Sequence, residues 1–193
     1  MAVMKRRYTL GKRAEQQAET RRKIVEAAVD LHTQLGPAHT TVSMVAERAG
    51  VQRHTFYAHF PDERELLMAC SGLVEERDPV PSAAPWRTIK DPGERLRAGL
   101  SALYAYYGRH AQLLASVLRD AEVSPLVAEI AHTQWGPFMG ELNAVLGEGL
   151  NEKQQAMVRV AVSFFTWRTL TRDAGLSQEA AVDAMAAAVI AAG

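Results

Sequence analysis

The chain has 193 residues, enough for one large domain or for a small module joined to a larger one, and enough to bury a core without disulfides. Hydrophobic residues make up 48% and charged residues 23%, which excludes a wholly disordered chain, and a single cysteine excludes an internal disulfide. The zero net charge hides an asymmetry, because residues 1–64 carry eleven Lys and Arg against seven Asp and Glu, whereas the rest carries eleven against fifteen. Positive charge gathered towards one end suits a polyanion partner.

The N-terminal segment is the most basic part of the chain, with eight Lys and Arg against two Glu in the first 25 residues. Such a segment can also be no more than a solvated end, so the charge alone is a weak signal. We expect residues 1–18 to form a basic, flexible arm. A helix should follow from about Thr20 to Leu35, because apolar residues recur there at helical spacing and Gly36-Pro37 should end it.

Residues 62–65 (Asp-Glu-Arg-Glu) have the pattern of a capping box, in which Asp62 accepts from a backbone N–H and Glu65 reaches back. This pattern predicts a helix that runs from there through about Leu73. Four prolines follow between residues 78 and 93, and prolines at that density exclude a continuous helix. A linker is therefore expected over this stretch.

The remainder reads as helix throughout, with no internal repeat and no β-strand alternation. Gly136-Pro137 should kink or break the helix that contains it. The expected helices are residues 92–109, 111–121, 125–150, 152–174 and 178–190. Together with the N-terminal elements they predict an all-α fold of about nine helices.

The strongest functional signal lies in residues 40–60. Two short helices are expected over residues 42–49 and 53–59, with Gly50 allowing the tight turn that a crossing of about 90–120° needs. Ala46 supplies the small side chain where the helices touch, and apolar neighbours form a shared core: Val42, Val45, Ala49, Val51 and Phe56. The polar groups left on the second helix are of the kind that reach base edges and phosphates in a DNA major groove. The alternative is an ordinary pair of helices with a polar outer face.

Residues 20–67 resemble the DNA-binding domain of tetracycline-repressor (TetR) type regulators. The segments that carry the resemblance are Thr40-Thr41-Val42, Val45-Ala46-Glu47, Ala49-Gly50-Val51, Thr55-Phe56-Tyr57-Ala58-His59-Phe60, Asp62 and Leu66-Leu67. The resemblance implies a three-helix DNA-binding head over residues 19–67 and a helical domain for ligand binding and dimerisation over residues 68–193.

The resemblance also implies roles for individual residues. Thr41 would contact phosphate at the start of the second helix, residues 52–55 would face the groove, and Tyr57 and His59 would hold the DNA backbone. Phosphate contacts set the register, whereas base contacts carry the sequence information. The residues expected to touch DNA are Thr40, Thr41, Ser43, Gln52, Arg53, His54, Thr55, Tyr57, His59 and Arg64.

Two positions depart from the family pattern. His54 stands where such sequences often have glycine, so a bulkier group there could read a base or alter the docking depth. Glu63 stands where the family often has a lysine that meets phosphate. Because Glu63 would repel phosphate, we expect Arg64 to take over this contact.

Aromatic residues and methionine recur in the C-terminal part, where they are either core residues or the lining of an apolar ligand pocket with a few polar groups. A helix broken at Gly136-Pro137, beside large aromatic side chains, would be the most suggestive place for a cavity. The candidate ligand-binding residues are Trp86, Tyr104, Tyr107, His110, Trp135, Phe138, Met139, Phe164, Phe165 and Trp167.

The last two helices are rich in alanine among larger apolar residues, so they should be buried on more than one side. This predicts a two-fold homodimer built from paired helices, or alternatively the core helices of a monomer. A dimer would match the half-sites of a palindromic double-stranded operator about 34–36 Å apart or a multiple of that spacing. We expect a repressor that a small hydrophobic or aromatic effector releases by shifting the fourth helix.

The sequence lacks the Gly-x-Ser-x-Gly motif of serine hydrolases, the P-loop of nucleotide-binding proteins and the Gly-x-Gly-x-x-Gly motif of dinucleotide-binding proteins. Its six histidines show no metal-ligand spacing. We therefore expect no enzymatic activity, no cofactor and no metal. A helical adaptor for protein partners is the remaining alternative, and DNA affinity that falls with salt would distinguish the two. The sequence also lacks an apolar run of about 18 residues and a secretory signal, which predicts a cytoplasmic protein without a membrane span.

Overall fold

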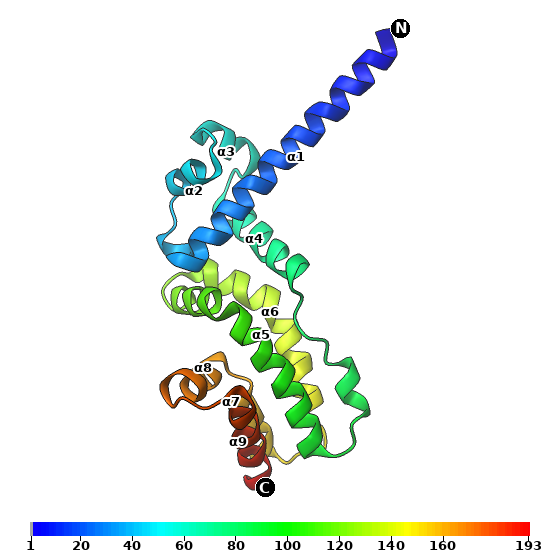
Figure 1. Ribbon diagram of the computed structural model, residues 1–193, viewed down its shortest axis with the longest axis vertical. Helices are drawn as coiled ribbons and strands as arrows, with labels where there is room; N and C mark the ends of the chain where they lie inside the picture. Colours follow the sequence, from blue (N-terminus) through cyan, green and yellow to red (C-terminus); the bar gives the residue numbers. More distant parts are fainter. Residues whose placement is uncertain (1) are drawn as a thin grey trace. The chain divides into compact units, whose positions relative to one another are not determined.

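The computed structural model describes residues 2–193, with side chains from residue 11 onwards, and all regular elements in this part are helical (Figure 1). The nine α-helices in the described residues confirm the predicted all-α class. They are α1 (Ala2–Gln34), α2 (Val42–Ala49), α3 (Arg53–His59), α4 (Glu63–Arg77), α5 (Pro92–Ala121), α6 (Pro125–Leu146), α7 (Glu152–Ala161), α8 (Phe164–Arg168) and α9 (Gln178–Ala191). Two 3-10 helices, η1 (Pro37–His39) and η2 (Ala84–Thr88), and a π-helical turn, η3 (Thr169–Asp173), complete the elements.

The chain divides into two compact units. Unit 1 comprises Met1–Asp78 and Ala115–Ile130, and unit 2 comprises Pro79–Leu114 and Ala131–Gly193. Unit 1 therefore contains the first four helices together with the end of α5 and the start of α6. None of the helices in the described part of the chain is long and apolar enough to cross a membrane.

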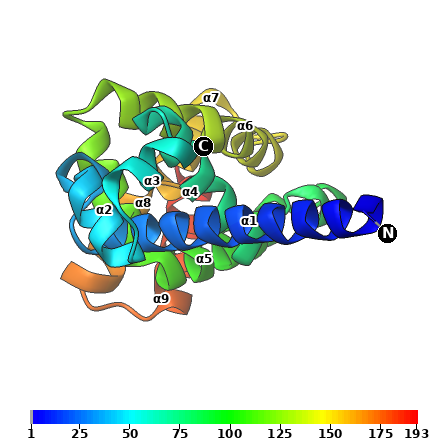
Figure 2. The same cartoon turned by 90° about the horizontal axis from the view of Figure 1, so that it is seen from above.

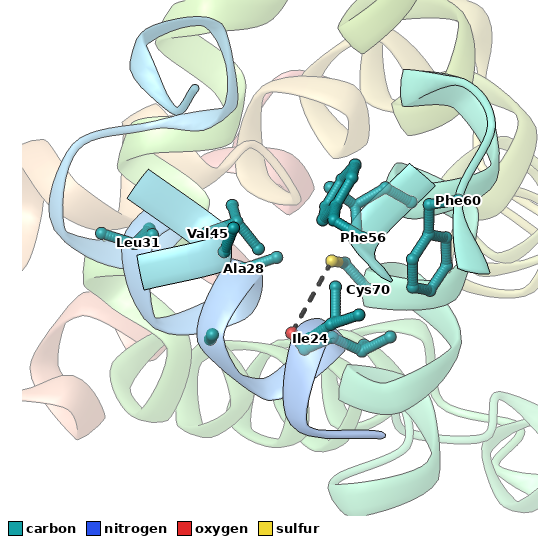
Figure 3. Packing of buried hydrophobic residues seen from close by; sticks show 11 residues of the cluster. Ile24, Ala28, Leu31, Val45, Phe56, Phe60 and Cys70 are labelled. Atoms are coloured by element: carbon teal, nitrogen blue, oxygen red, sulfur yellow. Dashed lines mark hydrogen bonds between the residues drawn. The ribbon is translucent and has the colours of Figure 1, made fainter. Parts of the chain in front are cut away.

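In unit 1, α1 packs against α2 and α4, and α2 packs against α3. Figure 3 shows the apolar side chains of these helices meeting in one core, with Ile24, Ala28 and Leu31 contributed by α1. Cys70 lies in the same core with its Sγ 4.0 Å from the Val25 carbonyl oxygen, and burial raises the pKa of its thiol to about 12. The thiol therefore stays protonated at neutral pH and acts as an apolar packing group.

Helix α1 begins well before the Thr20 start that the sequence predicts. The structure continues it back to Ala2, through the residues that were expected to form an arm. Figures 1 and 2 show this first half of α1 extending beyond helices α2 to α4. The basic side chains before residue 11 lie outside the side chains that the structure describes.

Two helices in the C-terminal part continue through residues where the sequence suggested an interruption. Helix α5 is one helix to Ala121 instead of two, because buried Tyr107 and Leu114 hold it on both sides of the expected break. Helix α6 continues through Pro137, which removes one hydrogen bond to the Thr133 carbonyl. Both residues are exposed, so water can satisfy the carbonyl that the proline leaves free.

The segment that was expected as a single helix over residues 152–174 is divided into α7, α8 and η3. The division falls after Val162, where Ser163 is the N-cap of α8 and its hydroxyl accepts from the Phe165 N–H at 3.2 Å. The Tyr104 and Tyr107 hydroxyls donate to the carbonyls of Ala161 and Val162, at 2.8 and 2.6 Å. Buried donors from α5 thus satisfy carbonyl groups that the end of α7 leaves free.

Candidate functional site

The two helices over residues 42–49 and 53–59 have the bounds that the sequence predicts. Thr41 is the N-cap of α2, and its hydroxyl accepts from the Met44 N–H at 3.3 Å. Gly50 ends α2 with φ of 67°, the left-handed conformation that glycine adopts without steric cost. The turn therefore depends on the glycine that the sequence singled out.

The exposed side of α3 is polar because its apolar residue faces the core. Phe56 is 2% exposed and packs with Val45 and Ala46 of α2. Among the residues predicted to face DNA, four at the start and on the outer face of α3 are exposed: Gln52, Arg53, His54 and Tyr57. Two others on this helix, Thr55 and His59, are half-buried.

The start of α2 presents the other candidates. Thr41 and Ser43 are exposed, and Thr40 is half-buried with its hydroxyl donating to the Gly36 carbonyl at 2.8 Å. Thr40 is thereby tied to the turn after α1. The structure thus brings the start of α2 and the outer face of α3 together on one helix pair.

Arg21 contributes to this site and was not among the predicted residues. Its guanidinium donates to the His59 carbonyl at 3.0 Å and lies over the Phe60 ring, 4.1 Å from the centroid. A cation at the carbonyl end of a helix is favourable, so Arg21 fixes the end of α3 from α1. No local pattern could reveal this contact, because the two residues are 38 positions apart.

Arg64, the expected phosphate contact, is held by a carboxylate. Its two terminal nitrogens donate to the Glu129 oxygens of α6 at 2.6 and 2.7 Å. Both side chains are exposed, and this pairing holds the pKa of the Glu129 carboxyl below its usual value. Glu129 is a second residue that the sequence did not indicate.

In unit 2 the predicted ligand-binding aromatics form two groups. The first is buried and consists of Tyr104, Tyr107, Phe164 and Trp167, whose neighbouring rings lie 5.4–6.3 Å apart. The second surrounds Tyr106, whose ring centroid lies 4.4 Å from that of His110 and 5.7 Å from that of Trp135. Trp135 in turn contacts Phe138, with ring centroids 6.2 Å apart.

The remaining candidates lie in different surroundings. Trp86 is buried in η2 at 8% exposure, and Met139 is half-buried on α6. Phe165 is 46% exposed on α8 and contacts the edge of the first aromatic group through Phe164. The sequence could not separate this outward-facing aromatic from its buried neighbours.

Comparison with known proteins identifies the helix pair. Residues 24–70 match the family model described as bacterial regulatory proteins, tetR family. The chain is 38% identical over 79 residues to the HTH-type transcriptional regulator TtgR of Pseudomonas putida, a match that covers 40% of this chain and 38% of TtgR. It is 29% identical over 146 residues to the HTH-type transcriptional repressor KstR of Rhodococcus jostii, covering 75% of this chain and 68% of KstR.

The fold is also shared with solved structures. The transcriptional regulator FadR from Bacillus subtilis, solved in complex with stearoyl-CoA, aligns with a TM-score of 0.62 at 18% identity, over 89% of this chain and 98% of FadR. With the capped α2, the glycine turn and the polar outer face of α3, these findings define a protein of the helix-turn-helix class. Residues 24–70 are thus similar to the tetR family of bacterial regulatory proteins, and the relatives named here are transcriptional regulators.

Proposed function

We propose that this protein is a homodimeric transcriptional repressor that binds a palindromic operator and is released by a small hydrophobic or aromatic ligand. Residues 19–67 would bind DNA, and residues 68–193 would bind the ligand and form the dimer, in the cytoplasm and without a catalytic role. The observation that carries the proposal is α3 itself, which buries Phe56 and exposes Arg53, His54 and Tyr57. The name of KstR, a transcriptional repressor, supports the direction of control.

The contribution of α3 can be divided between affinity and specificity. Tyr57→Ala is expected to weaken binding to all duplexes, because Tyr57 would contact the DNA backbone. Arg53→Ala is expected to change sequence preference, at about 1–3 kcal/mol for a lost bidentate base contact. Quantitative binding to an operator selected by the parent protein, and to single-base variants of it, measures both effects.

Arg159→Ala is the matched control, because it removes an exposed arginine from α7 in unit 2. Its operator affinity should equal that of the parent. Unchanged binding by both Tyr57→Ala and Arg53→Ala would contradict the assignment of α3. DNA binding that does not fall steeply with salt would favour an adaptor for protein partners instead.

The dimer is supported by apolar side chains that unit 2 leaves exposed. Val160 and Phe165 are each 46% exposed, and Ile190 is 42% exposed, on α7, α8 and α9. Helix α7 packs against both α8 and α9, and exposed apolar side chains gathered on neighbouring helices are typical of surfaces that a partner covers. A second copy of the chain, joined through these helices, would cover them and give two recognition helices for two half-sites.

Phe165→Glu is expected to convert a dimer into a folded monomer, because a carboxylate would be buried without a partner in the interface. Sedimentation or light scattering at micromolar concentration measures the change. Val123→Glu is the control, since Val123 is 74% exposed in the α5–α6 turn of unit 1, and it should remain dimeric. A parent protein that is monomeric at this concentration would contradict the dimer.

The ligand proposal rests on the aromatic groups of unit 2. Trp135, Phe138 and Met139 on α6 are only half-buried, so they offer apolar surface beside the fully buried Tyr106. FadR was solved with stearoyl-CoA, which makes long-chain acyl compounds the first probes for this chain. A thermal-shift screen followed by operator release tests this part, and a compound that binds without changing operator affinity is not the effector.

A further inference from the structure

The contact between Arg64 and Glu129 joins the DNA-binding helices to α6 within unit 1. Arg64 is the second residue of α4, and Glu129 lies in the second turn of α6. The guanidinium binds the carboxylate through two parallel hydrogen bonds, at 2.6 and 2.7 Å. Side-chain exposures of 49% and 55% leave both groups in reach of a polyanion.

Arg64 is the only Lys or Arg in the stretch of sequence that joins α3 to α4 and forms most of α4. Helix α3 ends at His59, and no other Lys or Arg occurs between that residue and Arg77. Its neighbours in the first turn of α4 are carboxylates: Asp62 as the N-cap, Glu63 and Glu65. Within the first turn of α4 itself, a phosphate would therefore meet one attractive side chain and three repulsive ones, with the Arg21 guanidinium nearby at the end of α3.

A guanidinium binds a phosphate in the same bidentate geometry as a carboxylate. The nitrogens of Arg64 that would face a phosphate are the ones that Glu129 occupies. We propose that Glu129 competes with an operator phosphate for Arg64, so that this carboxylate of α6 weakens DNA binding and Arg64 exchanges one partner for the other. The proposal rests on the proposed function.

The exchange does not require the helices to separate. One turn beyond Arg64, Leu67 is buried against Val127 and Ile130 of α6. These apolar contacts hold α4 on α6 whether or not the ion pair is formed. Glu129 is thus a positioning residue that acts on DNA affinity only through Arg64.

The test uses Glu129→Gln, Arg64→Gln and the double variant, each in the full chain. The probe is a duplex that the parent protein selects from a random-sequence pool. Glu129→Gln is expected to bind it more tightly than the parent, by about 1.4- to fivefold for each protomer of the dimer, the range that exposed ion pairs span. Arg64→Gln is expected to bind more weakly and to lose about 0.9 per protomer, or about 1.8 for the dimer, from the slope of log affinity against log salt, as for one phosphate contact in each half-site.

The double variant distinguishes competition for Arg64 from a general repulsion of DNA by the charge of Glu129. Under competition it binds as Arg64→Gln does, because Glu129 has no effect once Arg64 is gone. Tightening by Glu129→Gln in the Arg64→Gln background would overturn the proposal in favour of a general charge effect. Glu122→Gln, which removes another exposed carboxylate of unit 1, should match the parent.

A purely structural ion pair predicts a different pattern, since either single substitution breaks it. Equal weakening by Glu129→Gln and Arg64→Gln would therefore overturn the proposal while leaving the proposed function intact. The midpoint of thermal unfolding of each variant should equal that of the parent, which shows that a change in DNA affinity does not come from a change in folding. A parent protein without salt-dependent DNA binding would overturn the proposed function and this inference together.

Discussion

Replacing Gly36 by alanine is expected to lower the free energy of unfolding by about 3 kcal/mol or more. Gly36 has φ of 99° and ψ of 152°, a region that only glycine adopts readily. A Cβ at this position would overlap the carboxylate of Asp120 and the guanidinium of Arg119. Backbone strain and steric overlap therefore act together, and denaturant unfolding of the variant measures their sum.

The overlap is costly because Asp120 cannot move away. Its carboxylate is fully buried, accepts from the Ala38 N–H at 2.9 Å and pairs with Arg119 at 2.8 Å. Arg119 also donates to the Leu35 carbonyl at 2.7 Å, so the last turn of α5 holds the chain immediately after α1. Displacing a buried charge from these partners would leave it unpaired in the core.

Substitutions at two other glycines separate the effect of backbone strain from that of steric overlap. Gly50 also has positive φ, at 67°, but an added Cβ would meet no atom within 4 Å, so Gly50→Ala should cost only the backbone strain of about 1–2 kcal/mol. Gly72 lies within α4 with open space around it, so Gly72→Ala should stabilise the protein by up to about 1 kcal/mol. If Gly36→Ala lowered the free energy of unfolding no more than Gly50→Ala does, steric overlap with Asp120 would not contribute.

Acidification from pH 7 to pH 4 is expected to remove about 3 kcal/mol of stability through His32 alone. His32 is 5% exposed, and burial lowers its pKa from the usual 6.5 to about 4, against the opposing effect of the Asp120 charge. In the unfolded chain His32 therefore takes up a proton near pH 6.5, whereas in the folded protein it does so only near pH 4. Proton uptake by the unfolded state alone means that stability falls across this window as pH falls.

The contribution of His32 can be isolated by comparing variants, because carboxylates also titrate below pH 5. His32→Leu removes the titrating group and keeps an apolar side chain in the core. The difference in unfolding free energy between pH 7 and pH 4, measured with urea, should be smaller in this variant by about 3 kcal/mol. An equal pH dependence in parent and variant would show that His32 is protonated in the folded protein as readily as in the unfolded chain.

The helix pair of the candidate site was predictable because its signals are local. The bounds of α2 and α3 follow from apolar spacing and the Gly50 turn, all within about 20 residues. The burial of Phe56 and the exposure of Tyr57 follow from the same periodicity. The partners of the site were not predictable in this way, since Arg21 reaches His59 and Arg64 reaches Glu129 across long stretches of chain.

The C-terminal helices show where local signals mislead. Pro137 suggested a kink or a break, and α6 continues through it because the cost of one lost hydrogen bond is small where the freed carbonyl is open to solvent. Residues 152–174 suggested one helix, yet the Tyr104 and Tyr107 hydroxyls meet the carbonyl groups where α7 ends. In both places contacts from other helices, or from solvent, outweigh the intrinsic preference of the segment.

By itself, the sequence determined the all-α class, the helix-turn-helix and the polar side chains at the start and on the outer face of its second helix. These features depend on residues within a few turns of one another, where spacing and capping chemistry act directly. Only the tertiary structure decided that Asp120 and Glu129 join the DNA-binding helices, because a buried carboxylate and an exposed one look alike in a sequence. What distinguishes them is the set of groups that folding brings to each carboxylate, which is the backbone N–H of Ala38 for one and the guanidinium of Arg64 for the other.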